Sequence, residues 1–302
     1  WLVVSDSEQT LMAVPIEENL RFNRPQLRLL SNFYSPMLEL FYQSQTLSSA
    51  QAWQLLLIAI SKLYPNWLSL RATPLTAAQV DLLINSANQH YCSAFSYKFS
   101  AHYQANCISL EQYWQKRPSQ LRNTLKRKSR HLKQQQHRFE LTAKPDAIHI
   151  EHYWQIYQHS WKHPEPSKAF INGLFEWGSM LGALRLGLLY IDEQVVACQL
   201  WLVHQKTAYI FKLAQNIEAN QYSPGSLLTE YMINKIKQQD NIEQLDFLLG
   251  DDDFKALWMD EKQQIFGIEV LNQQCLTGRI LAQFQQFKRS IKTLFKSGPS
   301  AC

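Results

Sequence analysis

The feature that most constrains the fold is a run of three strand-like segments at residues 183–190, 195–204 and 207–214. They are joined only by residues 191–194 and 205–206, and joins this short are typical of antiparallel hairpins. A helix at 224–239 and a short apolar strand at 245–249 follow. Because crossovers are right-handed, this strand is expected beside and parallel to the third one. The order predicts an α/β (α+β) fold with a mixed, mostly antiparallel sheet flanked by helices.

The start of the helix at 224–239 has the composition of an anion site. Ser223 is suited to be its N-cap, Pro224 falls at the first helical position, and Gly225 has no Cβ to obstruct a ligand. A helix N-terminus carries a partial positive charge and free amides, which suits phosphate groups. We therefore expect the amides of Gly225, Ser226 and Leu227 to hold a phosphate or pyrophosphate next to the end of the strand at 245–249.

Composition narrows the classes of protein that fit. The 302 residues are 46% hydrophobic and 18% charged, which is typical of a globular chain with one or two domains. No apolar run reaches the roughly 18 residues of a membrane span. The five cysteines are scattered without a CxxC pair, which argues against a disulfide framework or a zinc site and favours the cytoplasm.

Three other segments admit two interpretations each. The polar helix at 109–136 carries a cationic face that suits phosphate or nucleic acid, although charge runs are more often solvated. His149 and His152 are spaced to share a metal, but without a third ligand nearby we expect no metal. The segment 278–296 places apolar residues at helical spacing with basic residues among them. It predicts a helix packed on the body of the protein, with peripheral membrane contact as the alternative.

Five pieces of the sequence resemble one family. They are LRNTLKRKSRHL, SWK at 160–162, FKLA at 211–214, YSPGSLL at 222–228, and DFLLG at 246–250 followed by Phe254, Lys255 and Trp258. In this order and spacing they resemble the CelD/BcsL (cellulose-biosynthesis-type acetyltransferase) branch of the GNAT N-acyltransferases, which is related to the FemAB transferases. The chain departs from that branch at Gln215 and Asn216, where the family often has Tyr-Asp.

The resemblance implies two tandem GNAT-like halves and an architecture in four parts. Residues 1–105 would form a degenerate N-terminal half, 106–145 a basic helical connector, 146–275 the acyltransferase domain, and 276–302 an amphipathic helix and tail. It also implies acetyl-CoA or another acyl-CoA as cosubstrate and a small-molecule or carrier-linked amine as acceptor, in envelope or exopolysaccharide metabolism.

Roles for individual residues follow from this chemistry. Amide formation from a thioester needs a deprotonated amine, a polarised carbonyl and a protonated leaving thiolate. Asp246 is the expected base or amine-orienting group, the alternative being a salt bridge to Lys255 or Lys212. The resemblance implies that Lys255 contacts an anionic acceptor or developing charge. Tyr222 would protonate the thiolate, unless it only packs at the helix start.

The remaining expected contacts are with the two substrates. The cofactor-binding set comprises Ser223, Gly225, Ser226, Leu227, Leu228 and Lys212. The acceptor-binding set comprises Trp161, Lys162 and Trp258, although large aromatic residues also fill cores. Two other functions stay open at this point. One is a Fem-like transferase that uses aminoacyl-tRNA, and the other is a non-catalytic GNAT-like module that binds a ligand or partner.

Overall fold

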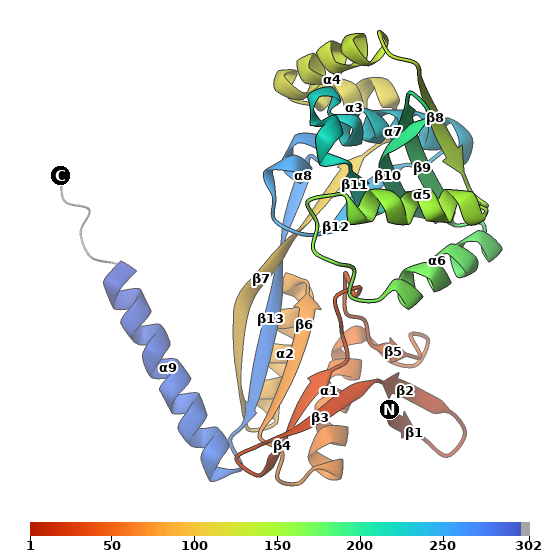
Figure 1. Ribbon diagram of the computed structural model, residues 1–302. Coiled ribbons are helices and arrows are strands. Elements are labelled where there is room, and N and C mark those ends of the chain that lie inside the picture. The colour runs from red at the N-terminus through yellow and green to blue at the C-terminus, as the bar shows by residue number, and fades with distance from the viewer. Residues whose placement is uncertain (297–302) are drawn as a thin grey trace, which may run out of the picture. The chain divides into compact units, whose positions relative to one another are not determined.

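The computed structural model describes residues 1–296 and divides them into two compact units (Figure 1). Unit 1 comprises Trp1–Ala101 together with the chain from Gln264 onward, and unit 2 comprises His102–Gln263. The strands β7 (Cys92–Asn106) and β13 (Glu261–Asn272) contribute residues to both. In the described part of the chain, no helix is both long and apolar enough to cross a membrane.

Unit 1 is built on five strands in the order β3-β4-β6-β13-β7 and a small sheet in the order β1-β2-β5. The remaining strands are β1 (Leu2–Ser5), β2 (Thr10–Val14), β3 (Ile16–Arg21), β4 (Arg24–Leu29), β5 (Phe41–Tyr42) and β6 (Ser69–Leu75). Its helices are α1 (Ser49–Leu63), α2 (Ala77–Gln89) and α9 (Leu276–Lys296). Capping boxes at Ser48 and Thr76 begin α1 and α2. The buried side chains of Trp53, Leu56 and Leu70 belong to the core of this unit.

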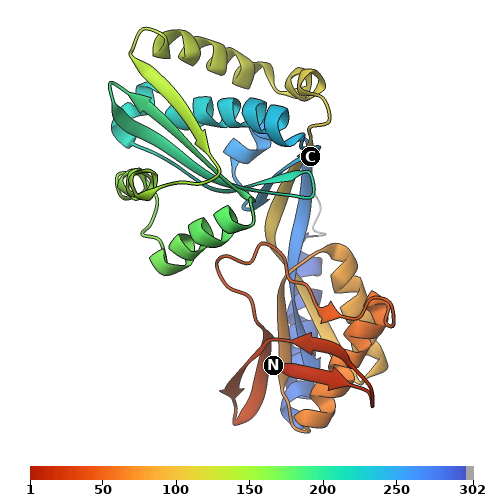
Figure 2. The ribbon, with the colours of Figure 1, turned by 90° about the vertical axis from the view of Figure 1, so that its right-hand side faces the viewer.

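Unit 2 continues the sheet with strands in the order β7-β12-β11-β10-β9-β8. These are β8 (His137–Thr142), β9 (Leu184–Ile191), β10 (Gln194–His204), β11 (Thr207–Gln215) and β12 (Gln244–Leu249). The helices are α3 (Leu110–Lys116), α4 (Ser119–Leu132), α5 (Ala147–Gln158), α6 (Lys168–Met180), the 3-10 turn η1 (Ile217–Tyr222), α7 (Pro224–Asp240) and α8 (Asp253–Trp258). Helices α4 and α7 lie on one side of this sheet, and α5 and α6 lie on the other (Figure 2).

The predicted meander is confirmed, because β9, β10 and β11 pair antiparallel in sequence order. Both hairpin turns use two non-glycine residues at positive φ, Asp192-Glu193 and Gln205-Lys206. This turn geometry matches the right-handed twist of the strands that it joins. The predicted crossover is also present, since β12 pairs parallel with β11 after α7.

The two units do not follow the expected domain boundaries. Strand β8 lies in the expected connector at 106–145, but it pairs with β9 and forms an edge of the unit 2 sheet. Most of β13 and all of α9 belong with the N-terminal residues, since β13 pairs with β6. The domain boundaries differ from the prediction because strands that are distant in the sequence pair with one another, and local composition does not indicate such pairing.

Candidate functional site

The site begins where two parallel strands separate. β11 and β12 pair only from Thr207 opposite Gln244 to Tyr209 opposite Asp246. Beyond this point the two strands diverge, and Leu248 adopts a positive φ of 55° that interrupts the ladder of β12. A cavity of about 530 Å³ is lined by the end of β11, the start of α7, α8 and the α5–α6 loop. Its lining residues are Trp161, Lys162, Leu213, Gln215, Ser223, Gly225, Ser226, Asp252, Phe254 and Lys255.

Lys255 joins the cavity to the end of β12, where this strand has separated from β11. Its Nζ donates hydrogen bonds to the carbonyl oxygens of Phe247 at 2.9 Å and Leu249 at 2.5 Å. Gly250 makes room for this contact, because a Cβ there would lie 2.5 Å from the Lys255 Nζ. An ammonium group has three hydrogens, so one remains for a ligand. Burial lowers the pKa of Lys255, against the opposing effect of the Asp252 carboxylate.

Lys162 brings a second cation to the cavity. Its side chain is half-buried, and within the described residues its Nζ makes no hydrogen bond or salt bridge. Its nearest ring contact is with Trp161, at 5.8 Å from the ring centre. Burial lowers the pKa of Lys162, and the neighbouring charge of Lys212 lowers it further. A half-buried cation that makes no hydrogen bond or salt bridge favours an anionic or electron-rich ligand in this position.

The start of α7 differs from its prediction. Pro224 occupies the first turn as expected, but Ser223 has left-handed backbone angles and its side chain makes no capping hydrogen bond. The Gly225 amide instead donates to Gln215 Oε1 at 2.8 Å. The amides of Ser226 and Leu227 donate to the Ser223 carbonyl at 3.1 and 3.2 Å. All three amides of the expected phosphate cradle therefore have partners, one of which is a side chain that can rotate away.

The contact with Gln215 explains why position 225 is a glycine. A Cβ on Gly225 would lie 2.5 Å from Gln215 Oε1. The Gln215 amide nitrogen also donates to Asn220 Oδ1 at 2.5 Å, which fixes the orientation of the side chain. Gln215, one of the two family departures noted in the sequence, is thus a structural part of the cradle. Sequence reasoning marked this position as unusual but could not show that it caps the helix.

Asp246 lies outside the cavity lining and is buried. Its carboxylate contacts His102 Nε2 at 2.6 Å, accepts from Gln104 Nε2 at 2.9 Å, and accepts from the Leu248 amide at 2.7 Å. The alternative of a salt bridge to Lys255 or Lys212 is therefore wrong, because His102 and Gln104 on β7 supply the contacts. Asp246 stabilises the irregular backbone of β12 at the place where the strands separate.

Several other expected site residues also lie away from the cavity lining. The Lys212 Nζ is buried and pairs with Glu165 at 2.9 Å, so it is not a free phosphate ligand. The Tyr222 ring packs 4.7 Å from the ring of His131. Trp258 is fully buried, as are the helical residues Leu227 and Leu228. The cavity brings together six of the expected residues, namely Trp161, Lys162, Ser223, Gly225, Ser226 and Lys255.

A second cavity, of about 440 Å³, lies between α3, α4 and α7. Four cations of one face of α4 line it, together with Trp114 and Glu230: Arg122, Lys126, Arg130 and Lys133. Burial raises the pKa of Glu230. We call this cavity, with its four cationic side chains, the α4 groove. Part of the basic face of α4 therefore lines a cavity. Lys128 does not line it, because its Nζ donates a hydrogen bond to the carbonyl oxygen of Gln221.

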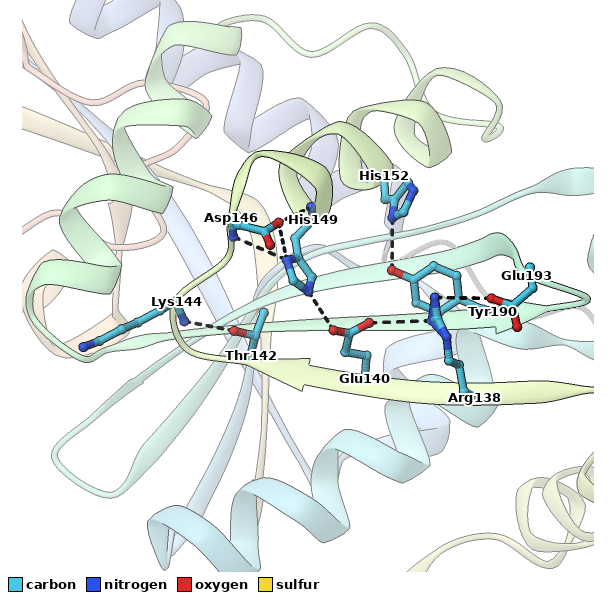
Figure 3. Close-up of polar contacts among 9 residues, drawn as sticks. All are labelled: Arg138, Glu140, Thr142, Lys144, Asp146, His149, His152, Tyr190 and Glu193. Carbon is cyan, nitrogen blue, oxygen red and sulfur yellow. Dashed lines mark hydrogen bonds and ion pairs between the residues drawn. The ribbon is translucent and has the colours of Figure 1, made fainter.

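The two histidines of α5 belong to a separate polar network (Figure 3). His149 contacts Glu140 at 2.7 Å and Asp146 at 2.6 Å, whereas His152 Nδ1 lies 3.0 Å from the Tyr190 hydroxyl. The imidazoles thus have different partners. Within residues 1–296, no group of His, Cys, Asp or Glu side chains is arranged to hold a metal ion.

Comparison with known proteins identifies the fold. Residues 119–256 match a family model described as "Acetyltransferase (GNAT) domain". Among solved structures, FemX is similar with a TM-score of 0.60 and 8% identity, covering 90% of this chain and 87% of that one. L-PGS from Bacillus licheniformis is similar with a TM-score of 0.55 and 13% identity, covering 89% of this chain and 84% of that one.

A third similar structure is the C-terminal domain (DUF2156) described as belonging to a lysylphosphatidylglycerol synthetase of Agrobacterium fabrum. Its TM-score is 0.54 at 13% identity, with 84% of this chain and 80% of that one covered. A search of curated proteins found no significant match. The predicted GNAT-like α/β fold is confirmed, and the likeness to FemX extends over both units because it covers 90% of the chain. Residues 119–256 are thus similar to GNAT acetyltransferase domains.

Proposed function

We propose that this protein transfers an acyl group from a CoA thioester to an amine, and that the 530 Å³ cavity is its reaction site. One observation carries the proposal. Every residue that lines the cavity, from Trp161 to Lys255, falls within the GNAT domain at residues 119–256. A cavity at the end of separated parallel strands, beside a helix N-terminus, is a favoured ligand position in α/β proteins.

The two lysines give the cavity a positive potential. An amine that enters beside Lys162 and Lys255 is disfavoured in its charged form, so its pKa falls and its nucleophilic neutral form becomes more abundant. The same charges stabilise the oxyanion that develops when the amine attacks the thioester carbonyl. We assign the free N–H of Lys255 and the ammonium of Lys162 to these two tasks. In this scheme Asp252, which lines the cavity, accepts the proton lost by the amine. When the C–S bond of the thioester breaks, the same carboxyl group returns this proton to the CoA thiolate.

Cofactor binding in this scheme requires a rearrangement of one side chain. The CoA pyrophosphate would displace Gln215 from the Gly225 amide and use that amide together with the positive end of α7. Asp246 then acts indirectly, since its contacts with His102 and the Leu248 amide stabilise the backbone that Lys255 binds. Tyr222 and Trp258 receive no catalytic or acceptor role.

Thermal shift and turnover test the proposal. Acetyl-CoA and longer acyl-CoAs, each at saturating concentration, are expected to raise the melting temperature. Lys162→Met and Lys255→Met should each lower kcat/KM with candidate amines by about 100-fold, the usual effect of losing one charge-stabilising group. Lys206→Met, at an exposed hairpin, is the matched control. Absence of any shift with every acyl-CoA would refute the proposal.

The α4 groove favours a second candidate function, a Fem-like transferase that takes its donor group from aminoacyl-tRNA. In the described chain, none of its four cations has a hydrogen bond or salt bridge, and cations at i, i+4 spacing repel one another. Such a groove suits a phosphate backbone. Neutralising Lys126 and Arg130 should then weaken tRNA binding and reduce its salt dependence. The control replaces Lys128, which faces η1. Equal binding by both variants would eliminate this candidate.

The finer features of the proposal rest on sequence resemblance. We infer membership of the CelD/BcsL branch, an acceptor from envelope or exopolysaccharide metabolism, and a cytoplasmic location. Four buried free cysteines, Cys92, Cys107, Cys198 and Cys275, support a reducing compartment. If acyl-CoA binds but the wild-type protein acylates no candidate amine, the protein is a non-catalytic ligand-binding module.

A further inference from the structure

Helix α9 of unit 1 carries two chemically different faces. One face contacts the rest of the unit. Leu281 packs against the small buried cluster of Phe95, Leu271 and Ala282. Gln285 donates to Glu269 Oε2 at 2.8 Å, and Arg289 donates to the Ser96 carbonyl at 2.6 Å. One face of the helix is therefore docked on its own chain, and the second face is free to bind a partner.

The second face is an exposed apolar stripe. It comprises Leu276, Ile280, Phe284, Phe287 and Ile291, with exposed fractions of 68%, 56%, 53%, 63% and 36%. Their spacing of three and four residues places them on one side of the helix. At 1.5 Å per residue the stripe is about 22 Å long. Large apolar side chains that are exposed singly need no explanation, but a continuous row of them indicates an interaction surface.

The charges around the stripe define its partner. Residues 276–296 contain no Asp or Glu, and their charged residues are Arg279, Lys288, Arg289, Lys292 and Lys296. With 3.6 residues per turn, Arg279 and Lys288 fall on opposite flanks of the stripe. The Lys288 Nζ lies 4.4 Å from the centre of the Phe284 ring, so its aliphatic stem follows the apolar face.

We propose that this α9 face binds in the plane of a membrane surface that contains anionic phospholipids. An amphipathic helix with aromatic residues on its apolar side and cations beside them has the composition of an interfacial helix. The apolar side chains would enter the boundary between headgroups and acyl chains, and the flanking cations would contact lipid phosphates. A second copy of α9 fits less well, because it would bring cations against cations with no acidic residue to pair with them. This surface is independent of the acyl-transfer proposal.

Vesicle co-sedimentation of the full chain tests the inference. One vesicle consists of phosphatidylcholine alone, and the other of equal parts of phosphatidylcholine and phosphatidylglycerol. The protein is expected to bind the mixed vesicles, and added salt should weaken binding. Phe287→Gln should weaken it by about tenfold or more through lost apolar burial. Lys288→Gln should weaken it by about fivefold, since each cation near an anionic surface contributes roughly 1 kcal/mol.

Phe41→Gln provides the matched control, because Phe41 is 61% exposed and Phe287 is 63% exposed. Both replacements are at exposed positions, so circular dichroism and melting temperature should match those of the wild type. Failure of the wild type to bind mixed vesicles would overturn the proposal, as would equal binding of Phe287→Gln or equal binding to both vesicles. A concentration-dependent dimer that Phe287→Gln abolishes, without vesicle binding, would assign the stripe to a second copy instead.

Discussion

Replacement of Gln215 by Ala separates two effects that the structure combines in one side chain. Gln215 Oε1 accepts from the Gly225 amide at 2.8 Å and thereby caps α7. Loss of a helix-start cap costs about 1 kcal/mol, so the variant should unfold about 2–4 °C lower for a unit of this size. The same replacement frees the amide for a ligand, because a pyrophosphate no longer has to displace the side chain.

The gain in affinity can be estimated from that single hydrogen bond. Its net contribution is about 1 kcal/mol, which corresponds to a roughly fivefold lower Kd for CoA. Isothermal titration calorimetry with CoA, and separately with inorganic pyrophosphate, measures the change. The two ligands should gain by similar factors, since the effect concerns only the phosphate position.

Gln79→Ala is the control for this experiment. Gln79 Oε1 accepts from the Thr76 amide at 2.9 Å at the start of α2, in the other unit. This variant should lose comparable stability and leave the Kd for CoA unchanged. If Gln215→Ala leaves both affinities unchanged or weaker while its melting temperature falls, Gln215 is a purely structural cap and the pyrophosphate position is wrong.

Three further predictions concern stability. Burial alone would lower the pKa of His149, but hydrogen bonds to two carboxylates outweigh it and raise the pKa. The stabilising effect of His149 is therefore complete below the ordinary pKa of about 6.5 and is lost as pH rises through the folded-state pKa. In urea unfolding, His149→Gln should therefore destabilise the protein more at pH ~5.5 than at pH ~8.5. Asp246→Ala should lower the free energy of unfolding by about 3–5 kcal/mol, because it leaves its buried partners unpaired, and a loss below about 1 kcal/mol would contradict the assigned contacts. Gly187→Ala should lower the free energy of unfolding by about 1–3 kcal/mol, since the new Cβ would lie 2.3 Å from Met232 Sδ. Gly173→Ala in α6, where no atom lies within 4 Å of the new Cβ, should instead raise it by about 0.5–1 kcal/mol. Chemical denaturation that ranks the two variants otherwise would refute this packing.

Local patterns were sufficient for most of unit 2. Short joins between apolar runs can form only tight hairpins, so the meander of β9, β10 and β11 followed from spacing alone. The order of helix and strand then determined the parallel pairing of β12 with β11 through crossover handedness. Within the site, local signals located the start of α7, whereas the family resemblance pointed to Lys255 of α8.

Tertiary structure decided which polar groups are available. Lys212 and Asp246 look similar to Lys255 in sequence, each being a charged residue in or beside an apolar strand. Burial requires a partner for a charge, and Glu165 and His102, both distant in sequence, supply those partners for Lys212 and Asp246. Only the folded chain shows which charged side chains are already paired and which still face the cavity.

The same distinction applies to the start of α7 and to helix α9. The sequence by itself determined that a helix starts at Pro224, because proline and glycine restrict backbone conformation locally. Whether the amides of that helix are free depended on Gln215, whose position is set by a strand that ends ten residues earlier. Likewise, periodicity predicted the α9 helix, whereas its docking through Leu281 and the exposure of its apolar stripe depended on packing against β7 and β13. Backbone preferences are local, but burial and pairing are properties of the whole fold.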